Sequence, residues 1–171
     1  MSHFPVPPIT LVAGLASQHL IARGRLPTRA SAAGAALLAG GSGWFLLGSL
    51  REFLREHTSF DPVDVSTPTT LVVMGPNRVT RNPMYLGMAG LLLAHAGLRR
   101  SGAALLPLTV FVLVIDRVQI TAEEDALAVT FGDDYAAYRR AVPRWVGARS
   151  LAALGLQMSR GGRGRLDGGQ P

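Results

Sequence analysis

The stretch ASAAGAALLAGGSGWFLLGSL, residues 30–50, decides the fold because it contains no charged residue. A helix needs about 20 consecutive apolar residues to cross the hydrocarbon core of a bilayer, and this stretch is long enough to do so. Ala32, Ala36 and Gly40 recur in it at every fourth residue. Such a stripe of small residues lets neighbouring membrane helices approach closely. The sequence therefore predicts a membrane helix here, packed along that stripe.

Three further apolar blocks flank this stretch, at residues 9–22, 85–98 and 101–115. The last block extends to residue 120 if Asp116 and Arg117 are included, whereas the other two are short for a membrane span. Any one short block is also compatible with a buried helix in a soluble core. Four blocks in a chain of 171 residues, of which only 16% are charged, instead predict an all-α polytopic membrane bundle of about four transmembrane helices.

Signals for export and for metal binding are weak in this sequence. The block at residues 9–22 lacks the basic segment and the A-x-A-like cleavage site of a secretory signal peptide, so we interpret it as the first membrane helix. The chain has no cysteine, and its four histidines are scattered without HxxxH spacing. Neither a disulfide nor a metal site is therefore expected.

The net charge is +6, and every basic residue is an arginine. The arginines lie mainly at the ends of the apolar blocks, where membrane proteins contact phospholipid head groups, and no RNA-binding aromatic motif accompanies them. We therefore expect a membrane partner and no nucleic acid. With four spans, the N-terminus, residues 51–84 and the C-terminal region share the side richer in arginine. This asymmetry predicts that the shared side is cytoplasmic, in what we expect to be a bacterial inner membrane.

A polar turn, GPNRVTRNPMYLG at residues 75–87, precedes the third apolar block. Asn82 is a favourable N-cap and Pro83 suits the first helical position, so a helix is expected to begin at Pro83. The free N–H groups and the positive dipole end of that helix, with Arg78 and Arg81 beside them, suit a carboxylate or a phosphate. An interfacial cap whose arginines contact lipid phosphates is the alternative.

A charged stretch, DRVQITAEEDALAVTFGDDYAAYRRAVPRWV at residues 116–146, follows the fourth block. A helix is expected to leave the membrane and continue past Glu123 and Glu124, with Gly132 placed to end it. A second helix then stops before Pro143. The sequence therefore predicts a C-terminal cytoplasmic helical hairpin on the same side as the polar turn, although such charges are also common on a solvated interfacial helix.

Together the two stretches resemble the membrane-embedded methyltransferases typified by isoprenylcysteine carboxyl methyltransferase and the phospholipid N-methyltransferases. That family carries G-x-x-R…R-H-P-x-Y-x-G at the start of a membrane helix, then a Glu-Glu pair, then F-G-x-x-Y-x-x-Y…V-P-R. The corresponding residues here, between residues 70 and 146, are Gly75, Arg78, Arg81, Asn82, Pro83, Tyr85 and Gly87, then Glu123 and Glu124, then Phe131, Gly132, Tyr135, Tyr138, Val142, Pro143 and Arg144. The family's histidine is Asn82 here, and an asparagine donates a hydrogen bond but cannot act as a base at neutral pH.

The resemblance implies an integral membrane enzyme that binds S-adenosylmethionine between the last two membrane helices and the hairpin. The helix start with its arginines suits the cofactor's carboxylate, the acidic pair suits its ribose hydroxyls or its ammonium, and the two tyrosines suit its adenine. Gly87 is expected to leave room for a ligand against the helix. The expected cofactor-binding residues are Arg78, Arg81, Asn82, Pro83, Tyr85, Gly87, Glu123, Glu124, Tyr135 and Tyr138, and the expected catalytic residues are Arg140 and Arg144.

The implied reaction is methyl transfer to a lipid-like or small apolar acceptor, which is a carboxylate, an amine or a thiol. One alternative is a membrane reductase that uses NADPH and binds its 2′-phosphate through arginines. Another is a small membrane protein without enzymatic activity. We expect N-terminal membrane helices and a connecting loop in residues 1–69, a catalytic methyltransferase core in residues 70–150, and a basic disordered tail in residues 151–171.

Overall fold

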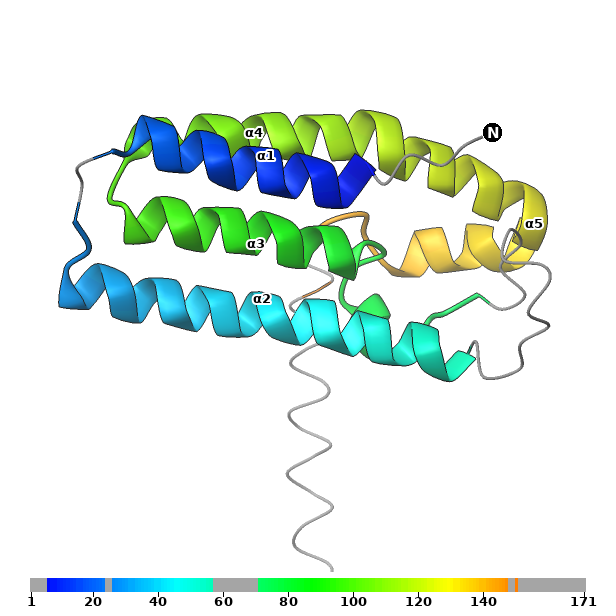
Figure 1. The fold of residues 1–171 in the computed structure, drawn as a ribbon. Helices are drawn as coiled ribbons and strands as arrows, with labels where there is room; N and C mark the ends of the chain where they lie inside the picture. Colours follow the sequence, from blue (N-terminus) through cyan, green and yellow to red (C-terminus); the bar gives the residue numbers. More distant parts are fainter. Residues whose placement is uncertain (1–5, 24–25, 57–70, 148–149, 151–171) are drawn as a thin grey trace, which may run out of the picture.

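The computed structural model describes residues 6–23, 26–56, 71–147 and 150 (Figure 1). The basic tail that the sequence predicts at residues 151–171 lies outside the described residues. The helices are α1 (Val6–Ile21), α2 (Arg29–Glu56), α3 (Pro83–Leu98), α4 (Leu105–Val114) and α5 (Ile120–Ala141), with the short helical turns η1 (Gly75–Arg78), η2 (Gly102–Ala104) and η3 (Ile115–Gln119). No strand occurs in these described ranges, so the predicted all-α class is confirmed.

Helices α1, α2, α3 and α4 lie side by side. α3 lies between α1 and α2, and α4 runs along α1 (Figure 1). Their shared core contains Leu92 of α3, Phe111 of α4, and Ile115 and Ile120 near the start of α5. α1 begins, α2 ends and α3 begins at the end of the bundle where α5 lies (Figure 1). The polar turn and the charged C-terminal stretch therefore meet at one end of the molecule.

Two of the described helical segments are long and apolar enough to cross a membrane, Arg29–Glu52 and Gly102–Ala141. The first contains the uncharged stretch at residues 30–50. α3 is apolar throughout but shorter than a full span of a bilayer core. The predicted count of four spans, and the side of the membrane on which each end lies, stay predictions.

The contact between α2 and α3 does not follow the stripe that the sequence predicts. A Cβ built on Gly40 has no neighbour within 4 Å, so Gly40 faces away from the rest of the protein. The α2 face that packs on α3 is instead the one that carries Ser42 and Leu46. A Cβ on Gly87 of α3 would lie 2.6 Å from Leu46 Cγ and 2.8 Å from the Ser42 carbonyl oxygen. Gly87 therefore permits close approach of the two helices, as does Gly90, whose Cβ would meet the Ser42 hydroxyl, and the expectation that Gly87 leaves room for a ligand is corrected to a packing role.

A π-helical turn, η3, joins α4 to α5 without a break in the helix. Ile115 and Ile120 at its two ends are both fully buried. In a regular α-helix, residues five apart point about 140° away from each other. The wider i→i+5 turn of a π-helix brings such residues to the same side. The buried residues Phe111, Ile115 and Ile120 are spaced first by four and then by five positions. The π-helical turn lets all three lie on the same face of the helix.

α5 changes direction at Gly132, where the sequence predicts a helix end. Gly132 has φ +49° and ψ −117°, a conformation that favours glycine. Beyond this kink the helix turns back toward the start of α3 (Figure 1). There the hydroxyl of Tyr138 donates a hydrogen bond to the carbonyl oxygen of Asn77 in η1 at 2.7 Å. The kink therefore directs the C-terminal part of α5 onto the turn that precedes α3.

Candidate active site

The turn before α3 places Asn82 at the N-cap position and Pro83 at the first helical position, as the sequence predicts. The predicted capping hydrogen bond, however, is absent: the Asn82 side chain makes no bond to the first turn of the helix. Its Nδ2 donates instead to the carbonyl oxygen of Arg144 at 3.0 Å. Asn82 therefore connects the start of α3 to the segment after α5 through its side-chain donor group.

Two more hydrogen bonds fasten the segment after α5 to the same turn. The hydroxyl of Thr80 donates to the carbonyl oxygen of Arg144 at 2.8 Å. The backbone N–H of Arg81 donates to the carbonyl oxygen of Pro143 at 2.9 Å. The two regions that carry the family-like motifs are therefore in direct backbone contact, although they lie more than 60 residues apart in the sequence.

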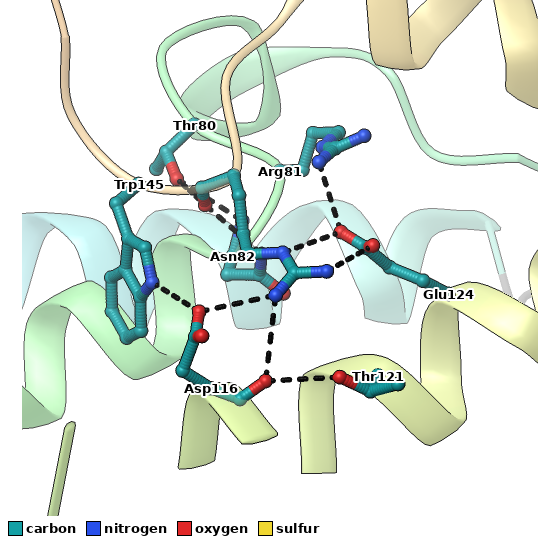
Figure 2. Close-up of polar contacts among 8 residues, drawn as sticks. Thr80, Arg81, Asn82, Asp116, Thr121, Glu124 and Trp145 are labelled. Carbon is teal, nitrogen blue, oxygen red and sulfur yellow. Dashed lines mark hydrogen bonds and ion pairs between the residues drawn. The ribbon is translucent and has the colours of Figure 1, made fainter. Parts of the chain in front are cut away.

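Glu124 is the centre of the charges at this place (Figure 2). Arg144 holds its carboxylate with two bonds, Nη2 to Oε2 at 2.6 Å and Nε to Oε1 at 3.1 Å. Arg81 Nη2 lies 2.9 Å from Oε1 of the same carboxylate. The bonds to Glu124 raise the pKa of Arg144 above its already high ordinary value, so its guanidinium stays charged at any physiological pH. The Glu124 side chain is only 8% exposed, which makes this a largely buried ion-pair cluster.

Arg81 is the member of the cluster whose hydrogen bonds are incomplete. Its side chain is 10% exposed, and its Nε and Nη1 atoms are buried without a partner in the described structure. Leaving a buried N–H unsatisfied costs about 1–3 kcal/mol, and more for a charged group. An ion-paired arginine with two unused donors is therefore the kind of group that a ligand oxygen completes.

A cavity of about 390 Å³ opens beside Arg81. It lies between the C-terminal end of α2, the start of α3, η1 and the first turns of α5. Its volume falls in the range of small-molecule sites in proteins. Its lining residues are Ser49, Asn77, Arg81, Asn82, Pro83, Met84, Tyr85, Glu123, Ala126 and Leu127.

Glu123 faces this cavity, unlike its neighbour Glu124. Its Oε1 accepts a hydrogen bond from the Tyr85 hydroxyl at 2.5 Å and another from Gln119 Nε2 at 2.7 Å. Both donors are neutral, and no arginine of the described residues forms an ion pair with Glu123. The carboxylate is thus oriented but keeps its negative charge toward the cavity.

The structure brings five of the residues predicted for cofactor binding to the cavity: Arg81, Asn82, Pro83, Tyr85 and Glu123. Glu124 lies next to it as the partner of Arg81. Glu124 neutralises two arginines in a largely buried cluster. Its contribution to the stability of the fold is therefore larger than that of a surface salt bridge.

Five other predicted residues lie away from the cavity lining. Arg78 is exposed, with its Nη2 2.9 Å from Met74 Sδ, and Arg140 is also exposed. Tyr135 is buried with Arg139 over its ring, and Tyr138 is used in its bond to η1. These positions support a structural role for the tyrosines rather than contact with an adenine. Arg144 contacts the acidic residues and does not line the cavity.

Sequence reasoning missed Asp116, Gln119, Trp145 and Ser49. Asp116 Oδ1 accepts from Trp145 Nε1 at 2.8 Å and from Arg144 Nη1 at 3.3 Å. The tryptophan beside the V-P-R segment was a signal for such a partner, because a buried indole N–H needs an acceptor. Ser49 comes from α2, in the segment that the sequence assigns to the N-terminal helices, and only the packing of α2 on α3 shows that it lines the cavity.

Comparison with known proteins gives a family for this arrangement. The phospholipid methyltransferase family model matches residues 30–134. A protein from Haemophilus influenzae described as uncharacterized is 40% identical over 63 residues, which are 37% of this chain and 100% of that protein. No solved structure matches the chain. The family match covers more than half of the chain and includes both the turn before α3 and the acidic pair, so the chain belongs to the phospholipid methyltransferase family of membrane proteins.

Proposed function

We propose that the protein transfers a methyl group from S-adenosylmethionine to a lipid-like or small apolar acceptor, with the cofactor bound in the cavity beside Arg81. The family is one of membrane methyltransferases, which supports the reaction class. The observation that carries the site is Arg81, a residue of the cavity lining whose buried guanidinium has two nitrogens without a partner in the described structure.

The residues at the cavity fit the polar groups of this cofactor. The positive charge of Arg81 suits the cofactor's carboxylate, and each of its two unpartnered nitrogens is able to donate a hydrogen bond to a ligand oxygen. The start of α3 adds free N–H groups and the positive end of the helix dipole on the same side. Glu123 offers an acceptor to the cofactor's ribose hydroxyls or its ammonium. Arg81 and Glu123 thus carry opposite charges on one cavity wall, and the amino-acid group of the cofactor has both complementary charges.

When bound, the cofactor supplies an electrophilic methyl group on a sulfonium, and the protein's contribution is positioning. Holding two reactants in line replaces a large entropic part of the barrier and needs no covalent help from the protein. Tyr85 and Gln119 fix the carboxylate of Glu123, and the Arg144–Glu124 pair fixes Arg81. The apolar side chains of Met84 and Leu127 line the remaining wall and limit the access of water. In this proposal Arg144 orients the site and Arg140 has no part in it.

The place of the cavity supports an apolar acceptor. It is lined by residues from the end of α2 and from the start of α5, and both helices belong to segments that are able to span a membrane. The functional core then includes Ser49 together with residues 70–150, so it extends into the region that the sequence assigns to the N-terminal helices. We further propose that this end of the bundle faces the cytoplasm. A cysteine placed at exposed Arg78 in this cysteine-free chain is then labelled from the cytoplasmic side only.

The reductase alternative has less support from the geometry. Of the five arginines that the sequence offers for a 2′-phosphate, Arg81 alone lines the described cavity. Arg144 is used in its bonds to two acidic residues, and the other three are exposed on the surface: Arg78, Arg139 and Arg140. A phosphate with two negative charges would also meet Glu123 in the same cavity.

The test is a titration of the purified protein in lipid nanodiscs with S-adenosylmethionine and, separately, with NADPH. We expect saturable binding of S-adenosylmethionine only, weakened about tenfold or more by Arg81→Gln, because a hydrogen bond to a charged group contributes about 1.5–3 kcal/mol. Arg78→Gln, which removes an exposed arginine of the same turn, is the matched control and should stay within about twofold. Binding of NADPH alone would favour a reductase, and binding of neither would favour a protein without this enzymatic activity.

A screen for the acceptor follows from the same preparation. Methyl-labelled S-adenosylmethionine is incubated with the protein and with membrane lipid extracts or small apolar carboxylates, amines and thiols. Transfer of label to one class identifies the acceptor, and Arg81→Gln is expected to reduce that transfer about tenfold at cofactor concentrations well below the parent's dissociation constant.

A further inference from the structure

The structure assigns Asp116 a role in positioning Arg81, through a chain of contacts that begins at Trp145 (Figure 2). This inference rests on the proposed function, because its readout is the affinity for S-adenosylmethionine. Asp116 touches neither Arg81 nor the cavity lining. It is therefore a positioning residue and not a catalytic one.

The chain of contacts alternates in charge at every step. The Trp145 indole donates to Asp116 Oδ1 at 2.8 Å, and Arg144 Nη1 lies 3.3 Å from the same oxygen. Arg144 then holds both oxygens of Glu124, whose Oε1 lies 2.9 Å from Arg81 Nη2. Arg144 is thus gripped by a carboxylate on each side, so its plane and the plane of Glu124 are fixed together.

The consequence for Arg81 follows from which of its nitrogens is used. Glu124 engages Nη2, while Nε and Nη1 keep their unpartnered N–H groups. An arginine side chain loses much conformational entropy when it is fixed in one rotamer. If the side chain were mobile before binding, that entropy would be lost on binding a ligand and would weaken the affinity. Holding Arg81 by Nη2 therefore fixes the position of its charge at the cavity lining before a ligand arrives.

The π-helical turn η3 explains why Asp116 takes part at all. Asp116 and Glu124 are eight residues apart, which in a regular α-helix turns them about 80° away from each other. The wider turn over Ile115–Gln119 rotates the chain less for each residue, so the two carboxylates both meet the guanidinium of Arg144. Inserted wide turns of this kind are frequent at functional sites.

The remaining contacts of Asp116 do not account for its placement. Its Oδ2 lies 3.5 Å from Arg117 Nε, but the Arg117 side chain is 77% exposed, and such surface pairs contribute little. Its backbone carbonyl accepts from Thr121 within the helix at 3.1 Å. The well-ordered bonds of the carboxylate are those to Trp145 and Arg144, which lead toward Arg81.

The test is a double-mutant cycle between Asp116→Asn and Arg81→Gln, read as the dissociation constant for S-adenosylmethionine in nanodiscs. Residues coupled in one network show interaction effects well above those of independent sites. We expect Asp116→Asn to weaken binding by about fivefold to tenfold when Arg81 is present. In the Arg81→Gln background the same change should weaken binding by less than about twofold. A merely structural role would produce equal losses in both backgrounds.

Two further variants keep the test decisive. Trp145→Phe removes only the indole donor and should repeat the pattern at smaller amplitude, which covers the case in which Asp116→Asn does not fold. Asp125→Asn changes an exposed aspartate of the same helix and should bind like the parent. Equal losses in both backgrounds, or no loss on changing Asp116, overturn the positioning role while the proposed function stands. Parent-like binding by Arg81→Gln alone overturns the proposed site, and the positioning role with it.

Discussion

Two adjacent residues of one acidic pair face two different regions of the molecule. Glu123 faces a cavity, is held by the neutral donors of Tyr85 and Gln119, and has no ion-pair partner among the described residues. Glu124 faces the segment after α5, is 8% exposed, and is neutralised by Arg81 and Arg144. The difference separates a carboxylate suited to meet a ligand from one that maintains the site.

A buried polar side chain at the other end of the bundle, Gln18, shows how a purely structural residue uses its hydrogen-bonding groups. There Gln18 is fully buried, donates to the carbonyl oxygens of Leu92 and Ala104, and has its own oxygen 2.9 Å from His95 Nδ1. All the hydrogen-bonding groups of Gln18 are used, which is the pattern of a residue that joins helices. Arg81, with two unused donors at a cavity, shows the opposite pattern.

Of the substitutions that test this difference, Glu124→Gln is expected to have the largest effect on stability. Removing the charge leaves Arg81 and Arg144 buried or half-buried without a full counter-ion, and removal of one partner of a buried pair costs about 3 kcal/mol or more. The apparent melting temperature of the detergent-solubilised protein, followed by tryptophan fluorescence, should fall markedly, and cofactor affinity should fall with it. An unchanged melting temperature would show that the cluster does not stabilise the fold.

The next effect is that of Glu123→Gln, the matched change one residue earlier. It keeps the size of the side chain and removes the charge that faces the cavity. We expect the affinity for S-adenosylmethionine to fall by about tenfold or more, with little change in the melting temperature of the ligand-free protein. If Glu123→Gln lowers the melting temperature as much as Glu124→Gln does, the two carboxylates have the same structural role and the comparison fails.

A smaller effect is expected at Asn82, which connects both regions to the start of α3. Asn82→Leu loses the bond to the Arg144 carbonyl and should cost about 1 kcal/mol of stability, with a weaker affinity for the cofactor. Asn82→His keeps a donor at this position and should preserve binding. The measurement is the same titration for both variants, and equal binding by the parent and the leucine variant would separate Asn82 from the site.

Much of the fold follows from features that the sequence displays locally. The uncharged stretch at residues 30–50 lies within α2, and the Asn-Pro pair marks the start of α3 at Pro83. Both are consequences of local chemistry, namely the length of an apolar run and the missing N–H of proline. The motif residues Arg81, Tyr85 and Glu123 also meet at one cavity, as the resemblance implies.

The parts that the sequence did not predict depend on helix rotation and on distant partners. Gly87 and Gly40 are both plausible packing residues, and only the packed pair of helices shows that Gly87 is the one in contact. The π-helical turn changes the angular position of every later residue, so a regular helical projection groups Asp116 with Glu123 instead of Glu124. Asn82 illustrates the distant-partner problem, because its donor is taken by a carbonyl 62 residues away.

The most direct test of the account compares S-adenosylmethionine with its decarboxylated analogue. The parent protein should bind the complete cofactor about tenfold or more tightly than the analogue, because Arg81 then has a carboxylate for its two unused donors. In Arg81→Gln this preference should fall to about twofold or less, whatever the variant does to overall stability, because each protein is compared with itself. A preference that is equally large in the parent and in Arg81→Gln would contradict the claim that Arg81 recognises the cofactor's carboxylate.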